Sequence, residues 1–151
     1  MALIIRKYTD TDLNAVLSSW ENGSRLAHPF LTEAFVEKVR HDIPNLYLPN
    51  AETWVADIDG IVVGFIALVF YLKDDKNCNE VGALFVEPEF HGQGIGKALM
   101  DKAHGIHGEL EVEVFKQNPV GRRFYDRYGF KCLNESIHPE TGLPVLRLVL
   151  R

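Results

Sequence analysis

Cysteine is scarce in this sequence, and long apolar runs are missing. Cys78 and Cys132 are the only cysteines among the 151 residues, and they lie far apart without a CxxC spacing. A structural zinc ion takes about four Cys or His ligands, so a zinc site of this kind is excluded. No uninterrupted apolar stretch approaches the roughly 20 residues that cross a bilayer. We therefore expect no metal and no membrane partner.

Clustered positive charge and targeting signals are missing as well. No basic stretch precedes an apolar one near the first residue, so we expect no signal peptide and a cytoplasmic location. The formal net charge is −5 without a Lys/Arg block, which argues against a nucleic-acid partner because phosphate contacts need clustered cations. The histidines are scattered, and the close pair His104 and His107 has no third metal ligand beside it. An acidic protein instead tolerates or attracts a cationic substrate such as an amine.

What is present is typical of one soluble domain. The sequence is 46% hydrophobic and 25% charged, which is ordinary for a globular protein. Its length is about that of one domain. No internal repeat, low-complexity tract or linker divides it, so we predict a single domain over residues 1–151.

The first third of the chain predicts a strand followed by two helices. Ala2–Tyr8 is the strand, and Asp10 is positioned to cap the first helix. Thr32 is positioned to cap the second helix, which Pro44 ends. The apolar residues of the first helix recur at helical spacing: Leu13, Val16, Leu17 and Trp20.

The middle of the chain predicts three strands. Thr53–Ile58 and Ile61–Tyr71 are apolar, β-branched runs joined by Asp59-Gly60, which is a strong hairpin signal. A polar turn over Lys73–Asn79 then leads into a third strand, Glu80–Val86.

The last third predicts two helices among three strands. A helix runs on from Gly94, and a period-2 strand spans residues 109–114. Asn118-Pro119 is typical of an N-cap followed by proline at the first helical position, and Gly129 closes that helix. The final strands are Phe130–Ile137 and Val145–Arg151. The whole order, β-α-α-β-β-β-α-β-α-β-β, predicts a mixed sheet with helices on its faces.

A glycine-rich turn stands between the third strand of the middle segment and the helix that follows. It reads His91-Gly92-Gln93-Gly94-Ile95-Gly96-Lys97. Glycines let the backbone approach a ligand closely. The free N–H groups and dipole of the helix start favour an anion. The turn is therefore a candidate phosphate site.

Two familiar phosphate motifs fit this turn poorly. A P-loop needs glycine where His91 stands and Ser or Thr where Ala98 stands. A dinucleotide fingerprint needs a third glycine where Lys97 stands. Neither motif is satisfied.

Two stretches of the chain resemble motifs of the GNAT superfamily of N-acetyltransferases. Gly94 and Gly96 match the glycines of motif A, Arg/Gln-x-x-Gly-x-Gly/Ala, with His91 in place of Arg or Gln. Residues 118–130 resemble motif B, Asn-x-x-Ala-x-x-Phe-Tyr-x-x-x-Gly-Phe, with Gly121 in place of alanine. The resemblance covers nearly the whole chain and is strongest to small stand-alone bacterial members. It implies an α/β fold: a mixed, mostly antiparallel sheet of about six or seven strands flanked by about four helices.

The resemblance also implies acetyl-CoA as cosubstrate, with motif A around its pyrophosphate. The backbone N–H of Phe85 or Val86 would stabilise the oxyanion. The expected cofactor-binding residues are Phe85, Val86, His91, Gly92, Gln93, Gly94, Ile95, Gly96, Lys97, Asn118, Phe124 and Tyr125.

Acetyl transfer from a thioester to an amine requires a group that accepts the proton of the amine and a group that donates a hydrogen bond to the leaving thiolate. A lysine-like amine is protonated at neutral pH, and making it neutral costs about 4–5 kcal/mol. The resemblance implies that Tyr125 hydrogen-bonds the thiolate. Full proton transfer from tyrosine to a thiolate runs uphill by about 2 kcal/mol, which favours a hydrogen bond that strengthens as charge develops.

The base is left among three candidates. Glu80 occupies the position of the catalytic glutamate of GNAT histone acetyltransferases, His28 has a pKa near neutrality and lies on the loop Ala27-His28-Pro29-Phe30, and water is the third. The resemblance implies that this loop lines the acceptor cleft, so we expect His28 and Phe30 to contact the acceptor. It also implies protein lysine side chains as a plausible acceptor.

We expect an N-acetyltransferase in which a primary amine attacks acetyl-CoA directly in a ternary complex. The amine is a protein lysine, an N-terminus or a small molecule, and the protein is a monomer or homodimer. The alternatives are a non-catalytic acyl-CoA-binding regulatory module and a nucleotide-binding switch, the second of which Ala98 disfavours.

Overall fold

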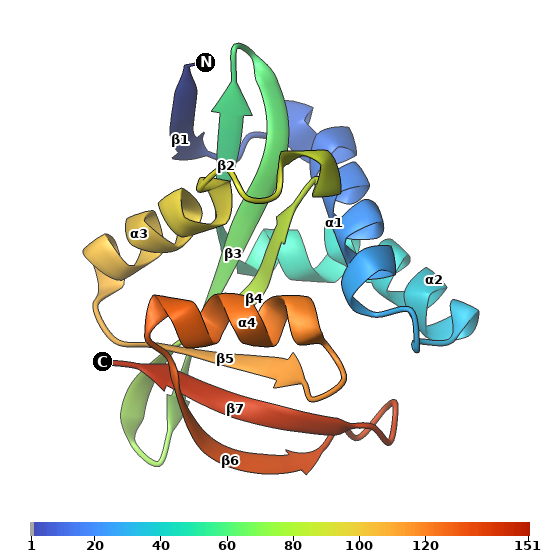
Figure 1. Cartoon of the computed structure of the whole chain (residues 1–151), viewed down its shortest axis with the longest axis vertical. Helices are drawn as coiled ribbons and strands as arrows, with labels where there is room; N and C mark the ends of the chain where they lie inside the picture. Colours follow the sequence, from blue (N-terminus) through green and yellow to red (C-terminus); the bar gives the residue numbers. More distant parts are fainter. Residues whose placement is uncertain (1) are drawn as a thin grey trace.

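The computed structural model describes residues 2–151 as one sheet with helices on both faces (Figure 1). The sheet has seven strands in this part of the chain, in the order β1-β2-β3-β4-β5-β7-β6. Every neighbouring pair is antiparallel except β4 and β5. The strands are β1 (Leu3–Lys7), β2 (Glu52–Ile58), β3 (Ile61–Lys73), β4 (Lys76–Val86), β5 (Leu110–Phe115), β6 (Lys131–Ile137) and β7 (Pro144–Leu150). The predicted element order and fold class are confirmed.

Four α-helices lie within residues 2–151: α1 (Leu13–Ala27), α2 (Glu33–Asp42), α3 (Ile95–His107) and α4 (Pro119–Tyr128). None of them is long and apolar enough to cross a membrane. As predicted, the Thr32 side chain caps α2 by accepting the Phe35 N–H, and α2 ends before Pro44. The chain then continues through a π-helical turn, Ile43–Tyr47, and a 3-10 turn, Leu48–Asn50.

The start of α1 differs from the prediction that Asp10 caps it. Asp10–Asp12 forms a 3-10 turn, and Asp12 rather than Asp10 accepts the Thr9 N–H in a capping box. Asp12 is buried and pairs with Arg6 of β1 at 2.8 Å. This ion pair crosses between two elements, so local sequence does not distinguish the two aspartates.

The two central hairpins differ in how closely they follow the sequence signals. Asp59 and Gly60 both have positive φ and join β2 to β3, as the Asp-Gly pair predicts. The turn predicted over Lys73–Asn79 is shorter, because the strands extend further and pair Lys73 with Lys76. Only Asp74 and Asp75 form the turn, and both have positive φ.

Helices cover the sheet with two separate apolar layers. α3 and α4 pack on one face through residues such as Ile95, Leu99 and Tyr125. α1 packs on the other face through Val16 and Trp20, and α2 lies beside it. α1, α3 and α4 are thus held by the burial of one apolar stripe each, while α2 contributes the partly buried Val36 and Val39.

A bulge in β4 separates two strands at the centre of the sheet. Ala67 pairs with Ala83 and Leu68 with Val81, so Gly82 has no partner on β3. Beyond this point β4 also leaves β5: the register between them covers only two residue pairs, Glu80 with Glu111 and Val81 with Val112. Figure 1 shows β4 and β5 diverging beneath α4. The gap between them positions the site.

Candidate active site

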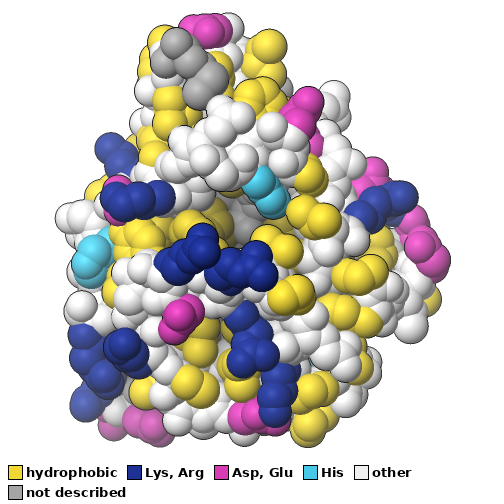
Figure 2. Space-filling view, in the orientation of Figure 1, with side chains coloured by type: hydrophobic (Ala, Val, Ile, Leu, Met, Phe, Trp, Pro, Cys, Tyr) yellow, Lys and Arg dark blue, Asp and Glu magenta, His cyan; other side chains and the backbone are white. Residues whose placement is uncertain are grey.

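A cavity of about 890 Å³ opens where β4 and β5 diverge. Its walls are the end of β4, the glycine-rich turn, the first turn of α3, β5 and one side of α4, and Figure 2 shows the hollow on the surface. It brings together most of the residues that the sequence assigned to the cofactor: Phe85, Val86, His91, Gly92, Gly94, Ile95, Gly96, Lys97, Asn118, Phe124 and Tyr125. Gln93 is exposed and does not line the cavity.

The glycine-rich turn presents unused backbone donors to this cavity. Gly92 and Gly94 have φ of 79° and 82°, which a residue with a side chain rarely adopts. Within the described chain, the N–H groups of residues 92–97 make no backbone hydrogen bond. They stand at the start of α3, where the helix dipole adds positive potential. The turn therefore fits an anion such as a pyrophosphate.

His91 holds the turn against β4. Its Nε2 donates to the backbone oxygen of Val86 at 2.8 Å, while its ring also lines the cavity. The histidine that replaces Arg or Gln in motif A thus connects the turn to the strand that precedes it. The carboxylate of Glu87 connects the end of β4 to α1, because it accepts from Asn22 at 2.7 Å and from Ser18 at 3.1 Å.

The end of β4 supplies one free amide near the middle of the cavity. Glu87 N–H donates to Val63 on β3, and successive N–H groups of a strand point to opposite edges. The Val86 N–H therefore points toward β5, beyond the two pairs that join β4 to β5. Of the two amides that the resemblance implies, Val86 is the unpaired one, while Phe85 faces β3.

Tyr125 presents its hydroxyl to the same cavity. The side chain is 7% exposed and packs against Phe124 and Phe130 at ring distances of 5.4 and 5.3 Å. The hydroxyl has no hydrogen-bond partner in residues 2–151. It still has some exposed surface, unlike Ser19 Oγ and Thr53 Oγ1, which are the fully enclosed atoms without a partner in that range. Burial raises the pKa of Tyr125 well above its ordinary value. Tyr125 is thus a protonated donor that opens to the cavity.

Asn118 uses both ends of its amide within the protein. Its Oδ1 caps α4 by accepting the Gly121 N–H at 2.8 Å, and its Nδ2 donates to His28 Nε2 at 3.1 Å. A Cβ at position 121 would lie 2.5 Å from Asn118 Nδ2. This contact explains why glycine stands where motif B has alanine: the Asn118 amide leans over the first turn of α4 to reach His28.

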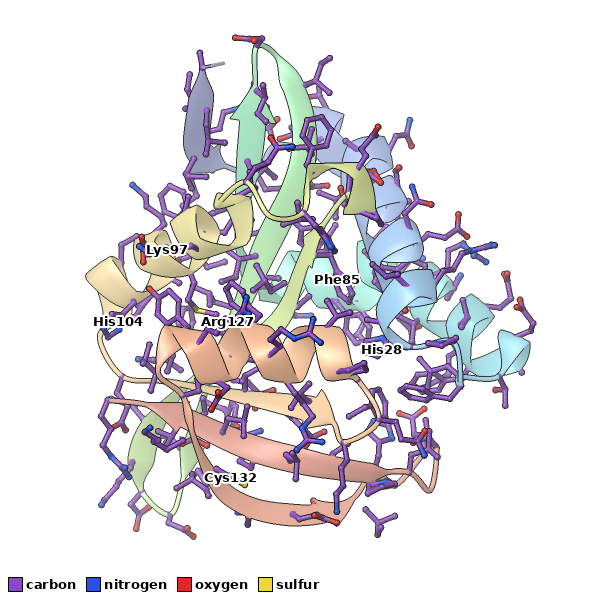
Figure 3. The ribbon with its side chains drawn as sticks, viewed as in Figure 1. His28, Phe85, Lys97, His104, Arg127 and Cys132 are labelled. Atoms are coloured by element: carbon purple, nitrogen blue, oxygen red, sulfur yellow. The ribbon has the colours of Figure 1, made fainter. Side chains whose placement is uncertain are left out.

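His28 is a partly buried ring between α1 and α4. It packs against Phe115 and Phe85 at ring distances of 5.2 and 6.3 Å, and its Nδ1 lies 3.3 Å from Ser24 Oγ. Figure 3 shows His28 and Phe85 beside the first turn of α4. Burial lowers the pKa of His28 to about 4. Phe30 reaches neither cavity and instead packs on His28 at 5.8 Å.

We expect His28 to make the fold sensitive to acid. Above about pH 6.5 the ring is neutral in both the folded and the unfolded chain. Between pH 6.5 and 4 the unfolded chain binds a proton that the folded protein does not, so stability falls with pH, by about 3 kcal/mol at pH 4 given the lowered pKa of about 4.

Denaturant unfolding at about pH 7 and pH 4 would measure this loss in the wild type and in His28→Gln. The variant has no proton to take up, so its loss should be smaller by that amount. Equal losses in the two proteins would contradict the neutral state of His28 in the folded protein.

A second cavity of about 470 Å³ lies on the α1 and α2 face of the sheet. Its walls come from α2, the turns over residues 43–50, β3 and β4. The two cavities are adjacent and share a wall, because five residues line both of them: His28, Gly82, Ala83, Phe85 and Phe115. Glu80 lines the second cavity and not the first.

Glu80 is held by one of its two carboxylate oxygens. Oε1 accepts from Tyr71 at 2.7 Å and pairs with Arg147 at 2.6 Å. Arg147 also pairs with Glu111 at 2.8 Å and donates to the Tyr71 hydroxyl. Among the described residues Oε2 has no partner. The network thus orients Glu80 and leaves one oxygen free.

Two parts of the site have no clear sign in the sequence. Arg123 and Arg127 stand one helical turn apart on α4 and line the first cavity without an ion pair in residues 2–151. Figure 2 shows Lys and Arg side chains over α4 beside the hollow. Their i, i+4 spacing was the available signal. The second cavity depends on contacts between distant segments, for which no local pattern exists. The same described residues hold no group of three or more potential metal ligands.

Comparison with known proteins places this geometry in a family. Residues 49–132 match the acetyltransferase (GNAT) domain. The chain is 30% identical over 141 residues to the peptidyl-lysine N-acetyltransferase YiaC of Escherichia coli, covering 93% of this chain and 92% of that protein. The solution structure of apo YjaB from Escherichia coli has a TM-score of 0.80 at 27% identity, covering 99% of this chain and 97% of that one.

A third protein shares the fold at lower identity. The PaiA N-acetyltransferase from Thermoplasma acidophilum, solved in complex with coenzyme A, has a TM-score of 0.75 at 22% identity and covers 97% of this chain and 98% of its own. Fold, glycine-rich turn and relatives lead to one assignment. The chain belongs to the GNAT superfamily of acetyl-CoA-dependent N-acetyltransferases.

Proposed function

We propose that this protein transfers an acetyl group from acetyl-CoA to a primary amine by direct attack in a ternary complex. The observation that carries this proposal is the pair of cavities that meet across one wall. The first cavity offers backbone N–H groups that can bind an anion, and the second offers a carboxylate. A thioester and an amine that enter from opposite sides would meet at the wall, which supports direct transfer without a covalent enzyme intermediate.

Acetyl-CoA would occupy the first cavity. The amides of residues 92–97 fit its pyrophosphate. Arg123 and Arg127, which have no ion pair within the described residues, could bind other phosphate oxygens of the cofactor. Lys97 pairs with Asp101 at 2.8 Å, so it is less available than the two arginines. When bound, acetyl-CoA supplies the activated acetyl group as a thioester.

Three groups of the chain would act on the reacting atoms. The Val86 N–H stands where an oxyanion can be stabilised, and the Tyr125 hydroxyl can donate to the departing sulfur. The free Oε2 of Glu80 can accept the proton of the amine, directly or through water. His28 is less suited, because both of its ring nitrogens are engaged and burial lowers its pKa to about 4, which makes it a weak base.

The acceptor is a primary amine, and a protein lysine is the first candidate. YiaC and YjaB are both named peptidyl-lysine N-acetyltransferases, and the chain spans more than nine-tenths of each. N-termini and small amines are the other candidates within the same chemistry.

Thiol release from acetyl-CoA, measured against a panel of amines, tests this function. The panel contains lysine peptides, peptides with a free N-terminus, polyamines and aminoglycosides. Release that depends on one class of amine would support the transferase. Tight binding of acetyl-CoA without release on any amine would contradict it and indicate a binding module instead.

The affinity for acetyl-CoA, measured by calorimetry on the purified protein and its variants, tests the cofactor cavity. Arg127→Gln should weaken acetyl-CoA binding about 10-fold, because a charge-assisted contact to phosphate is worth about 1.5–3 kcal/mol. Arg122→Gln is the matched control: Arg122 is on the same helix but does not line the cavity, and its side chain donates to the Lys116 carbonyl. Equal weakening in both variants would place the phosphates elsewhere.

A further inference from the structure

The second cavity combines an apolar wall with one carboxylate, and this combination selects among amines. We propose that the acceptor is an amine carried beside an apolar group, with a single positive charge at the site, and that polyamines and other polycations are poor acceptors. This inference rests on the proposed transferase function. It names the class of amine that the cavity takes.

The cavity is larger than one amine requires. Its volume of about 470 Å³ lies within the range of roughly 300–1,000 Å³ that is typical of pockets for whole small-molecule ligands. The straight carbon chain of a lysine side chain fills only part of such a space. A further group must enter with the amine if the cavity is to exclude water.

The lining residues specify the nature of that further group. α2 and the turns after it contribute side chains that are almost all apolar, and Phe65, Ala67 and Val69 of β3 form the floor. An apolar ligand group that packs against these side chains would replace water there. The apolar residues that α2 and its flanking turns contribute include Leu31, Phe35, Val36, Val39, Leu46 and Leu48.

The charge in the cavity is sufficient for one ammonium only. Glu80 is the one charged side chain among the described lining residues, because His28 is neutral. One oxygen of Glu80 is already shared with Arg147 and Tyr71. A second ammonium in this cavity would lose its water without gaining a second anionic partner, which costs several kcal/mol.

Isopentylamine and putrescine provide a matched test in the thiol-release assay. They have similar length, but putrescine has a second ammonium where isopentylamine has a branched apolar end. We expect kcat/KM to favour isopentylamine by at least about 10-fold. Peptides with blocked ends and a leucine beside the lysine should likewise have a higher kcat/KM than peptides with a second lysine at that place.

Leu46→Glu should reverse this preference in part. Leu46 lines the cavity and is 50% exposed, so the substitution adds a carboxylate with little risk to the fold. The ratio of isopentylamine to putrescine should fall at least about 10-fold. Leu26→Glu is the matched control, because Leu26 is 49% exposed and lines neither cavity.

Each outcome decides between the two proposals. Thiol release that favours putrescine in the wild type, or an equal change in Leu46→Glu and Leu26→Glu, overturns the inference about the amine and leaves the transferase intact. No release from any amine contradicts the proposed function, and the inference fails with it.

Discussion

Tyr125→Phe lowers kcat for acetyl transfer about 10- to 100-fold and leaves the Kd of acetyl-CoA within about threefold. This is the expected result if the hydroxyl donates a hydrogen bond that strengthens as the thiolate forms, because such a bond to a charged group is worth about 1.5–3 kcal/mol. The ring, which packs on Phe124 and Phe130, stays in place in the variant. Rapid-mixing kinetics and calorimetry measure the two quantities separately.

The pKa of Tyr125 determines what kind of donor it is. Burial raises that pKa, so the hydroxyl stays protonated throughout the working pH range and gives up its proton reluctantly. Any loss of activity at alkaline pH must then come from another group. A hydrogen bond to sulfur, with the proton finally supplied by water or by the nitrogen of the tetrahedral adduct as it becomes the amide, is consistent with this direction.

Tyr128→Phe is the control for the loss of a hydroxyl from the same helix. Tyr128 lines the cavity too, but its hydroxyl donates to Asp101 at 2.5 Å and is occupied. We expect kcat within about threefold of the wild type. A loss in Tyr128→Phe equal to that in Tyr125→Phe, or a loss in affinity rather than in kcat, would contradict the proposed role of Tyr125.

Glu80→Gln should lower kcat/KM for the amine about 100-fold, which is the typical scale of general-base catalysis. Acetyl-CoA binding should be unchanged, because Glu80 lines only the second cavity. The loss should shrink as the pH rises toward the pKa of the amine, near 10.4, since more of the amine is then neutral without a base. A pH profile of kcat/KM for both proteins measures this.

Glu111→Gln separates the chemistry of Glu80 from the structure of its network. Both carboxylates pair with Arg147, at 2.6 Å for Glu80 and 2.8 Å for Glu111. Glu111 lines neither cavity, so its variant removes one ion pair without removing a group from the acceptor site. Equal losses in Glu80→Gln and Glu111→Gln would mean that Glu80 acts only through the position of Arg147.

The elements that the sequence predicts well have signals contained within a few residues. Asp59-Gly60 defines its hairpin, Thr32 and Asn118 cap their helices through their own side chains, and the glycine-rich turn leads directly into α3. Each of these signals depends on backbone geometry that neighbouring residues settle among themselves. The mixed α/β fold follows from their order, and the structure confirms it.

The features that the sequence does not predict depend on partners far along the chain. Asp12 rather than Asp10 is chosen by Arg6 of β1, and Glu80 is oriented by Arg147, which lies 67 positions later. The bulge at Gly82 arises from the register between β3 and β4. Because both cavities depend on such contacts between distant segments, the sequence indicated which residues matter more clearly than how they meet.

The two residue pairs that join β4 to β5 have a consequence for thermal behaviour. A sheet interrupted at its centre loses ladder hydrogen bonds there, so the halves on either side are joined by side-chain contacts: the shared apolar core and the hydrogen bond between Asn118 and His28. A ligand seated in the gap contacts both halves and binds only the folded chain. At a concentration 100 times its Kd such a ligand adds about 2.7 kcal/mol to the free energy of unfolding. The melting temperature of this protein therefore reports how fully its cleft is occupied.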